Sequence, residues 1–178
     1  MATAATPSGG RVVAGLLALG VALAAFALAF QWRQTDGCLR FYGGDVARAI
    51  TTAPHVELWH LAAGDRPGRL VVVAKCDVSR AAGLVHLRRG LVEDANFSGP
   101  SSDPRPLPPA AWTVALAFGP AAGARPQAVV ALALDDEAAA VCLVGRPGRL
   151  GIGRLKRGLR TWVETTCPPP AGSVSGRP

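Results

Sequence analysis

The sequence lacks the residue spacings by which metal and haem sites are recognised. Its four cysteines lie far apart, at positions 38, 76, 142 and 167, and none belongs to a Cys-x-x-Cys or Cys-x-x-Cys-His motif. No acidic residue stands at a spacing from the three histidines that would define a catalytic triad. No glycine-rich loop ends in the Gly-Lys-Ser/Thr of a phosphate-binding loop. We therefore expect no cofactor and no metal, and the sequence favours a protein that is not an enzyme.

Aromatic residues and lysines are also scarce. Aromatic side chains make up 6% of the chain, and only two of the 19 basic side chains belong to lysine, although the formal net charge is +7. Proteins that bind single-stranded nucleic acid alternate basic side chains with stacking aromatics. Near the main basic run the only such aromatic residue is Trp162, so nucleic-acid binding is not expected. The bias toward arginine, alanine, glycine and proline is typical of a GC-rich bacterial genome.

What the sequence does contain is one long apolar stretch. Residues 12–30 include no charged or strongly polar side chain. A helix of that length, rising about 1.5 Å per residue, nearly spans a hydrocarbon core about 30 Å thick. Trp32 and Arg33 follow it, as interfacial anchors do. We predict a transmembrane helix that is kept as a signal anchor, preceded by a polar tail over residues 1–11.

A cleaved signal peptide is the alternative for this stretch. Small residues around Ala29 offer a cleavage site, and cleavage there would release a secreted domain. The length of the apolar stretch favours the uncleaved anchor. The flanking charges of Arg11 on one side and of Arg33 and Arg40, offset by Asp36, on the other are nearly balanced. The short tail before the helix favours a single-pass membrane protein with its domain on the extracytoplasmic side.

The rest of the chain is predicted to form a single α+β domain of mostly antiparallel strands with about three packed helices. Its first half covers residues 31–97 and its second half residues 112–166. A loop with five prolines, residues 98–111, joins the halves. Residues 167–178 are expected to be a disordered tail.

The elements expected inside this domain follow from hydrophobic periodicity and turn residues. In the first half they are a strand over 39–42, a helix capped by Asp45 and ended by Pro54, a hairpin of strands 55–62 and 69–76, and a helix from Ser79 to about 95. In the second half they are a meander of strands 112–118, 127–134 and 138–144, and a helix over 151–165.

The four cysteines could form two disulfides if the domain is exported, with three possible connectivities. Cys76 and Cys142 both lie in strand-like segments, which suggests one bridge between strands. Cys38 and Cys167 flank the domain, which suggests a second bridge between its ends. In a cytoplasmic domain the same residues would be reduced members of the core.

Basic residues gather on the last predicted helix. Opposite its apolar stripe lie Arg154, Lys156, Arg157 and Arg160. This face is a candidate surface for anionic phospholipid headgroups or another polyanion. The alternative is an ordinary solvated helix face.

The function that these features favour is a membrane-anchored domain of the bacterial envelope that acts as a non-enzymatic interaction or structural module. Its expected partner is the membrane, through residues 12–30, and the sequence specifies no protein partner. The alternative is an exported domain that binds or hydrolyses a small ligand, in which His60, His86 and Arg88 converge on a pocket.

Overall fold

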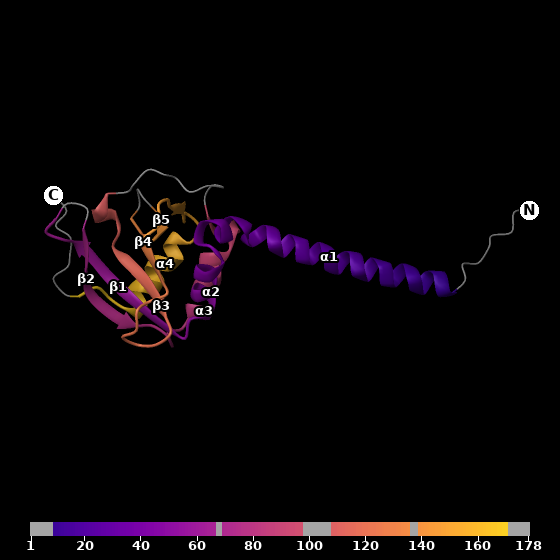
Figure 1. Cartoon of the computed structure of the whole chain (residues 1–178), viewed down its shortest axis with the longest axis horizontal. Helices are drawn as coiled ribbons and strands as arrows, with labels where there is room; N and C mark the ends of the chain where they lie inside the picture. Colours follow the sequence, from indigo (N-terminus) through magenta and orange to yellow (C-terminus); the bar gives the residue numbers. More distant parts are fainter. Residues whose placement is uncertain (1–8, 67–68, 98–107, 136–138, 171–178) are drawn as a thin grey trace, which may run out of the picture.

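The computed structural model describes residues 9–66, 69–97, 108–135 and 139–170 of the chain (Figure 1). Most of the predicted N-terminal tail, much of the proline-rich loop and the end of the predicted C-terminal tail lie outside these residues. An antiparallel sheet with helices packed on it confirms the predicted α+β class. A long helix projects from this domain (Figure 1).

The projecting helix is α1, Gly9–Tyr42. It contains the segment Val12–Phe30, which has a mean hydropathy of 2.6 and is long and apolar enough to cross a membrane. None of that segment is buried by the rest of the protein, so the segment is not a core helix of the domain. A signal sequence near the N-terminus would pass the same test of length and hydropathy.

The predicted strand over residues 39–42 is wrong, because α1 continues through it. The reason is the spacing of Cys38 and Tyr42. Four residues apart, they share one helix face, and both are buried in the domain, at 2% and 0% exposure. The helix that leaves the apolar segment therefore also supplies part of the domain core.

Six antiparallel strands form one sheet in the order β2-β1-β3-β4-β5-β6. Their bounds are His55–Ala63 (β1), Leu70–Asp77 (β2), Val114–Gly119 (β3), Ala128–Ala133 (β4), Ala140–Leu143 (β5) and Leu150–Gly151 (β6). The predicted hairpin corresponds to β1–β2 and the predicted meander to β3–β4–β5. The pairing of β1 with β3 joins the two halves of the chain in a single sheet.

Strand β6 was not predicted. Its two residues pair with Ala140 and Val141 of β5, and the second of them, Gly151, is the first residue of the helix expected over 151–165. The helix itself, α4, is shorter and covers Lys156–Thr166. Gly151 and Gly153 disfavour a helical start at this point, which leaves the backbone of residues 150–151 available to the sheet edge.

Two other helices begin at residues other than those predicted. Helix α2, Gly44–Thr52, begins after Gly43, whose φ of 78° favours glycine, and Asp45 lies in its first turn without capping it. Helix α3, Leu84–Val92, begins after Gly83, at φ 82°, and not at Ser79. The Ser79 side chain instead accepts a hydrogen bond from the backbone N–H of Val56 at 2.9 Å. A contact between distant segments has replaced the local cap.

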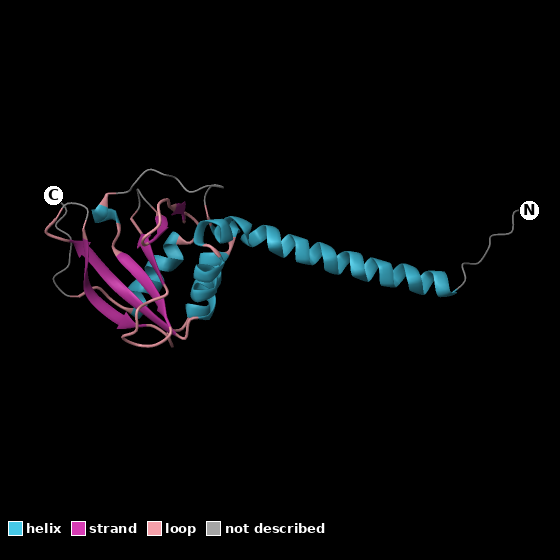
Figure 2. Cartoon of the chain, in the orientation of Figure 1, coloured by secondary structure: helices cyan, strands magenta, loops and turns pink. Residues whose placement is uncertain are grey.

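One face of the sheet forms the core with helices α2, α3 and α4, which Figure 2 shows in cyan beside the magenta strands. Alternate strand residues point into this core, as the period of two requires. The fully buried members include Leu58, Leu116, Phe118, Leu132 and Val141 from the sheet and Ile50 and Leu91 from the helices.

Candidate functional site

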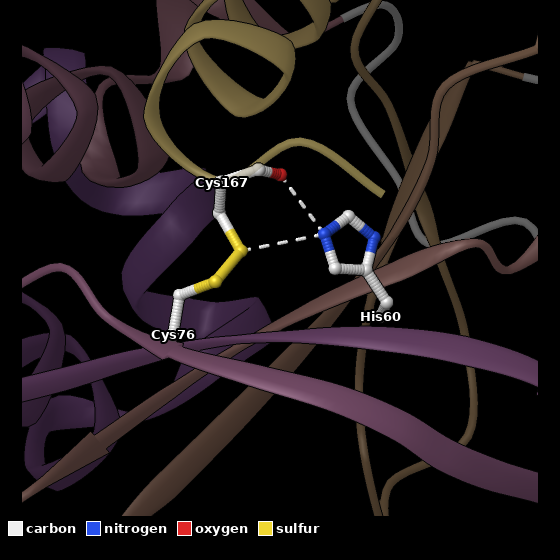
Figure 3. The surroundings of a disulfide bond; sticks show 3 residues. All are labelled: His60, Cys76 and Cys167. Carbon is white, nitrogen blue, oxygen red and sulfur yellow. Dashed lines mark hydrogen bonds between the residues drawn. A yellow bond between two sulfur atoms is a disulfide. The ribbon is translucent and has the colours of Figure 1, made fainter. Parts of the chain in front are cut away.

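A disulfide joins the end of the chain's last helix to the sheet (Figure 3). Cys76 of β2 bonds to Cys167, which directly follows α4, across a sequence separation of 91 residues. Cys167 was expected to begin a disordered tail, but it is only 1% exposed and so belongs to the folded domain. The disulfide therefore links the end of α4, in the second half of the chain, to β2, in the first half.

Neither of the two suggested cysteine pairings occurs, since Cys38 and Cys142 are both free. Cys76 pairs in register with Leu58 on the core face. Cys142 lies between the core residues Val141 and Leu143 and so points to the opposite face of the sheet. Burial raises the pKa of the Cys142 thiol to about 11 and also raises that of Cys38, to which Asp94 contributes. Both thiols are therefore poor nucleophiles at neutral pH.

His60 lies beside the disulfide (Figure 3). Its Nε2 is 2.9 Å from the backbone carbonyl oxygen of Cys167 and 3.4 Å from the Cys167 Sγ. His60 as a whole is only 6% exposed. Because a carbonyl oxygen only accepts, Nε2 carries the proton and donates it. His60 thus holds the end of α4 in place and has no open access to a substrate.

The other two residues of the suggested pocket have different partners. His86 is exposed on α3. Arg88 donates hydrogen bonds to the carbonyl oxygens of Thr51, at 3.0 Å, and Ala53, at 2.5 Å, at the end of α2. Among the described residues, no hydrogen bond or ion pair joins His60, His86 and Arg88.

A polar network that the sequence analysis did not identify lies where β1 begins and β2 ends. His55 Nδ1 is 3.2 Å from Ser79 Oγ, and His55 Nε2 is 3.2 Å from Glu57 Oε1. Asp77 Oδ1 accepts from both the hydroxyl and the backbone N–H of Ser79, at 2.5 and 2.9 Å. Trp59 Nε1 donates to Glu57 Oε2 at 2.7 Å. The alternation His-x-Glu-x-Trp along one strand face was the signal that could have revealed it.

The line of Ser79, His55 and Glu57 has the composition of a hydrolytic triad, but its hydrogen bonds are those of a structural link. The Ser79 hydroxyl already donates to Asp77, and its oxygen already accepts from the Val56 N–H. A serine nucleophile instead needs its proton directed to the histidine. The network therefore fastens the start of β1 to the chain after β2.

Hydrogen bonding holds two carboxylates of this network in their ionised form. The bond from Trp59 lowers the pKa of Glu57 against the opposing effect of burial, and His55 and Lys75 lower it further. Lys75 Nζ is 4.0 Å from Glu57 Oε2 and 4.6 Å from the centre of the Trp59 ring. The hydrogen bonds from Ser79 likewise lower the pKa of Asp77.

Replacement of Glu57 by glutamine is expected to cost about 1 kcal/mol of unfolding free energy at pH 7, because charge-assisted bonds become neutral ones. A lowered carboxyl pKa adds stability above the unfolded-state pKa, about 4.3, which is lost as pH falls through the folded-state value. The difference between Glu57→Gln and the wild type should therefore shrink between pH 5 and pH 3 in thermal unfolding. A difference that is constant with pH would contradict this role of Glu57.

The four basic residues predicted on the last helix do not form one free surface. Arg154 Nη1 donates to the carbonyl oxygen of Ala95 at 3.3 Å, and Arg160 Nη2 donates to that of Leu134. Lys156 is half-buried, and Arg157 is exposed. Arg154 lies in the turn before α4 and not on the helix as predicted, so it links that turn to Ala95, and Arg160 links α4 itself to Leu134.

The end of α1 is held by two polar side chains, Asp94 and Arg146, whose contacts the sequence did not reveal. Asp94, in the short 3-10 helix η1 (Asp94–Asn96), accepts hydrogen bonds from the backbone N–H groups of Gly37 at 2.7 Å and Cys38 at 2.6 Å. Arg146 Nη1 donates to the carbonyl oxygen of Tyr42 at 2.9 Å. These contacts fix the projecting helix to the domain.

Comparison with protein-family models, with curated proteins and with solved structures finds no match for the chain. Within the residues that the structure describes, no group of three or more histidine, cysteine or acidic side chains is placed to hold a metal ion. The function must be argued from the contacts given above.

Proposed function

We propose that this chain is a single-pass membrane protein of the bacterial envelope. Its α+β domain would lie on the extracytoplasmic side, held against the membrane surface as a non-enzymatic interaction or structural module. The observation that carries the proposal is the continuity of α1, which runs from the apolar segment Val12–Phe30 into the domain core at Cys38 and Tyr42.

The length of the connection supports a position next to the membrane. Cys38 follows Phe30 by eight residues, a distance that a helix covers in about 12 Å. The polar layer on each side of a bilayer's hydrocarbon core is roughly 5–8 Å thick. Cys38, which is buried in the domain, would therefore lie only a few ångströms beyond the headgroups. Cleavage near Ala29 would cut through the middle of α1, which favours a retained anchor.

Basic residues gather at the end of the domain from which α1 emerges. Arg146 contacts Tyr42 at the end of α1. Arg154 contacts Ala95, next to Asp94, whose carboxylate binds α1. Arg157 is exposed in the first turn of α4 and lines a groove with Ala81 and Thr161. A basic surface within a Debye length of anionic headgroups would be attracted to them. We propose that this end of the domain contacts anionic lipid.

The disulfide supports the proposed side of the membrane. Disulfides form and persist in oxidising compartments, such as the bacterial periplasm or the cell surface, and are rare in the cytosol. The Cys76–Cys167 bond closes the core at the end of α4. A domain built around such a bond is suited to the extracytoplasmic side.

The test of the headgroup contact uses the full chain in nanodiscs of phosphatidylcholine, with or without phosphatidylglycerol. Arginines are modified with phenylglyoxal and followed by mass spectrometry. We expect Arg157 to react several-fold more slowly when phosphatidylglycerol is present, and the effect to disappear at high salt. Arg69, in the turn between β1 and β2 on the far side of the domain from α1 (Figure 1), should react equally in both.

A variant with Arg154→Glu should lose most of the protection at Arg157, whereas Arg69→Glu, with the same change in charge, should keep it. Equal reaction rates of Arg157 in the two kinds of nanodisc would refute the proposed contact. Equal slowing of Arg157 and Arg69 would show a general effect of charge and would refute it as well.

A further inference from the structure

A pocket of about 530 Å³ lies between the end of α2 and helix α3. Its volume falls within the range of sites that bind small molecules. Two arginines, Arg88 and Arg89, contribute the polar groups most able to bind a ligand, and Leu84, Val85 and Val92 contribute an apolar wall. No acidic residue lines the pocket within the part of the chain that the structure describes.

Arg88 is the unusual member of this pocket because its charge is not matched by a carboxylate. The side chain is half-buried, and burial lowers its pKa. Its two Nη atoms donate to backbone carbonyl oxygens at the end of α2, while its buried Nε has no hydrogen-bond partner. A guanidinium has five N–H groups, so these two hydrogen bonds do not use all of its donors. Burying a charge without a counter-ion costs free energy that a bound anion would offset.

The surroundings of Arg88 define the kind of anion. Arg89 is exposed at the rim and forms no ion pair with a described carboxylate. Two guanidinium groups suit a phosphate monoester, which carries about −1.5 to −2 charges at neutral pH. The wall next to them is apolar, and Val85 is 76% exposed although it is a large hydrophobic residue. An organic group attached to the phosphate would cover it.

We propose that the pocket between α2 and α3 binds a phosphate monoester that carries a small apolar group, with Arg88 and Arg89 on the phosphate and Val85 against the apolar group. This site is separate from the basic end of the domain proposed to contact headgroups. Of the residues in the predicted small-ligand pocket, it uses Arg88 and neither His60 nor His86. The phosphate could belong to a free molecule or to a lipid with a phosphate-monoester headgroup.

The test measures binding of phenyl phosphate to the full chain in phosphatidylcholine nanodiscs by isothermal titration calorimetry. We expect saturable binding, tighter than that of inorganic phosphate or of phenol alone. Arg89→Gln should weaken it about tenfold, the loss expected when one charge-assisted contact is removed. Val85→Asp, which puts a carboxylate on the exposed rim, should weaken it at least as much.

The matched control is Arg69→Gln, which removes the same charge from the turn between β1 and β2 and should bind as the wild type does. Arg88→Met should also abolish binding. Because Arg88 holds the end of α2, that loss could come from a change in structure, so the test of the site relies on the Arg89 and Val85 variants. Thermal unfolding of each variant checks that it is folded. Three results would each overturn the proposed site. They are binding that does not saturate, a Val85→Asp variant that binds phenyl phosphate as tightly as the wild type, and an Arg69→Gln variant whose binding is weakened as much as that of Arg89→Gln.

The same titration in nanodiscs containing phosphatidic acid distinguishes the two sources of the phosphate. If the apparent affinity for phenyl phosphate falls there, and does so in the wild type but not in Arg89→Gln, the lipid headgroup occupies the site. If the wild-type affinity is unchanged, the site takes a free phosphate monoester. Either result retains the proposed site.

Discussion

Replacement of Cys167 by serine is expected to lower the free energy of unfolding by about 3–5 kcal/mol, which is a large part of the stability of a small domain. The disulfide to Cys76 spans 91 residues, and a cross-link of that length removes much of the freedom of the unfolded chain. It also holds the carbonyl of Cys167 where His60 donates to it. Denaturant unfolding of the full chain in nanodiscs, with and without a thiol reductant, measures the loss.

The double variant Cys76→Ser/Cys167→Ser is the matched control, because its stability should not respond to the reductant. Cys142→Ser should leave the response to reductant intact, since Cys142 is free. In intact cells, a denaturing quench with a thiol reagent should label two cysteines before reduction and four after it. Four labelled cysteines before reduction would mean that the bond does not form in the cell, and would contradict the proposed extracytoplasmic side.

Replacement of Asp94 by alanine is expected to cost about 2–4 kcal/mol of unfolding free energy. The Asp94 carboxylate accepts hydrogen bonds from two backbone N–H groups of α1, at 2.7 and 2.6 Å. Bonds to a charged group are each worth about 1.5–3 kcal/mol, and the two share one side chain and so do not add fully. Because these bonds join α1 to η1, the amides of residues 37–42 should also exchange hydrogen faster in Asp94→Ala.

Two variants keep this prediction specific. Asp94→Asn retains one acceptor oxygen and should lose less stability than Asp94→Ala. Asp36→Ala removes the same charge from α1, where Asp36 pairs with Arg40 on the surface, and should cost no more than about 1 kcal/mol. If Asp94→Ala and Asp36→Ala lost the same stability, the attachment of α1 through Asp94 would be wrong.

Most strands of the domain could be predicted from the sequence, because the signal for each strand is local. The apolar run that became β2 and the alternation that became β1 each need only their own residues. Helix starts were less predictable. Asp45 and Ser79 both fit the chemistry of an N-cap, yet Gly43 and Gly83 precede the helices. Ser79 instead accepts a hydrogen bond from Val56, which is 23 residues away in the sequence.

The candidate sites were less predictable than the fold, because the polar side chains bond with partners that are distant in the sequence and lie close only in the folded chain. Arg88 was predicted to line a ligand pocket with His60 and His86, and it instead binds carbonyl oxygens at the end of α2. Arg160 was expected on a free basic face and instead binds the carbonyl of Leu134. The network of His55, Glu57 and Ser79 depends on the approach of the chain after β2 to the start of β1.

The sequence alone determined the apolar segment of residues 12–30, the α+β class and the order of most elements. These follow from composition and periodicity, which are properties of neighbouring residues. Only the tertiary structure decided that Cys76 bonds Cys167, that β1 joins the two halves through β3, and that α1 continues into the core. Each depends on which distant segments meet, and that is set by packing of the whole core, which no local pattern encodes.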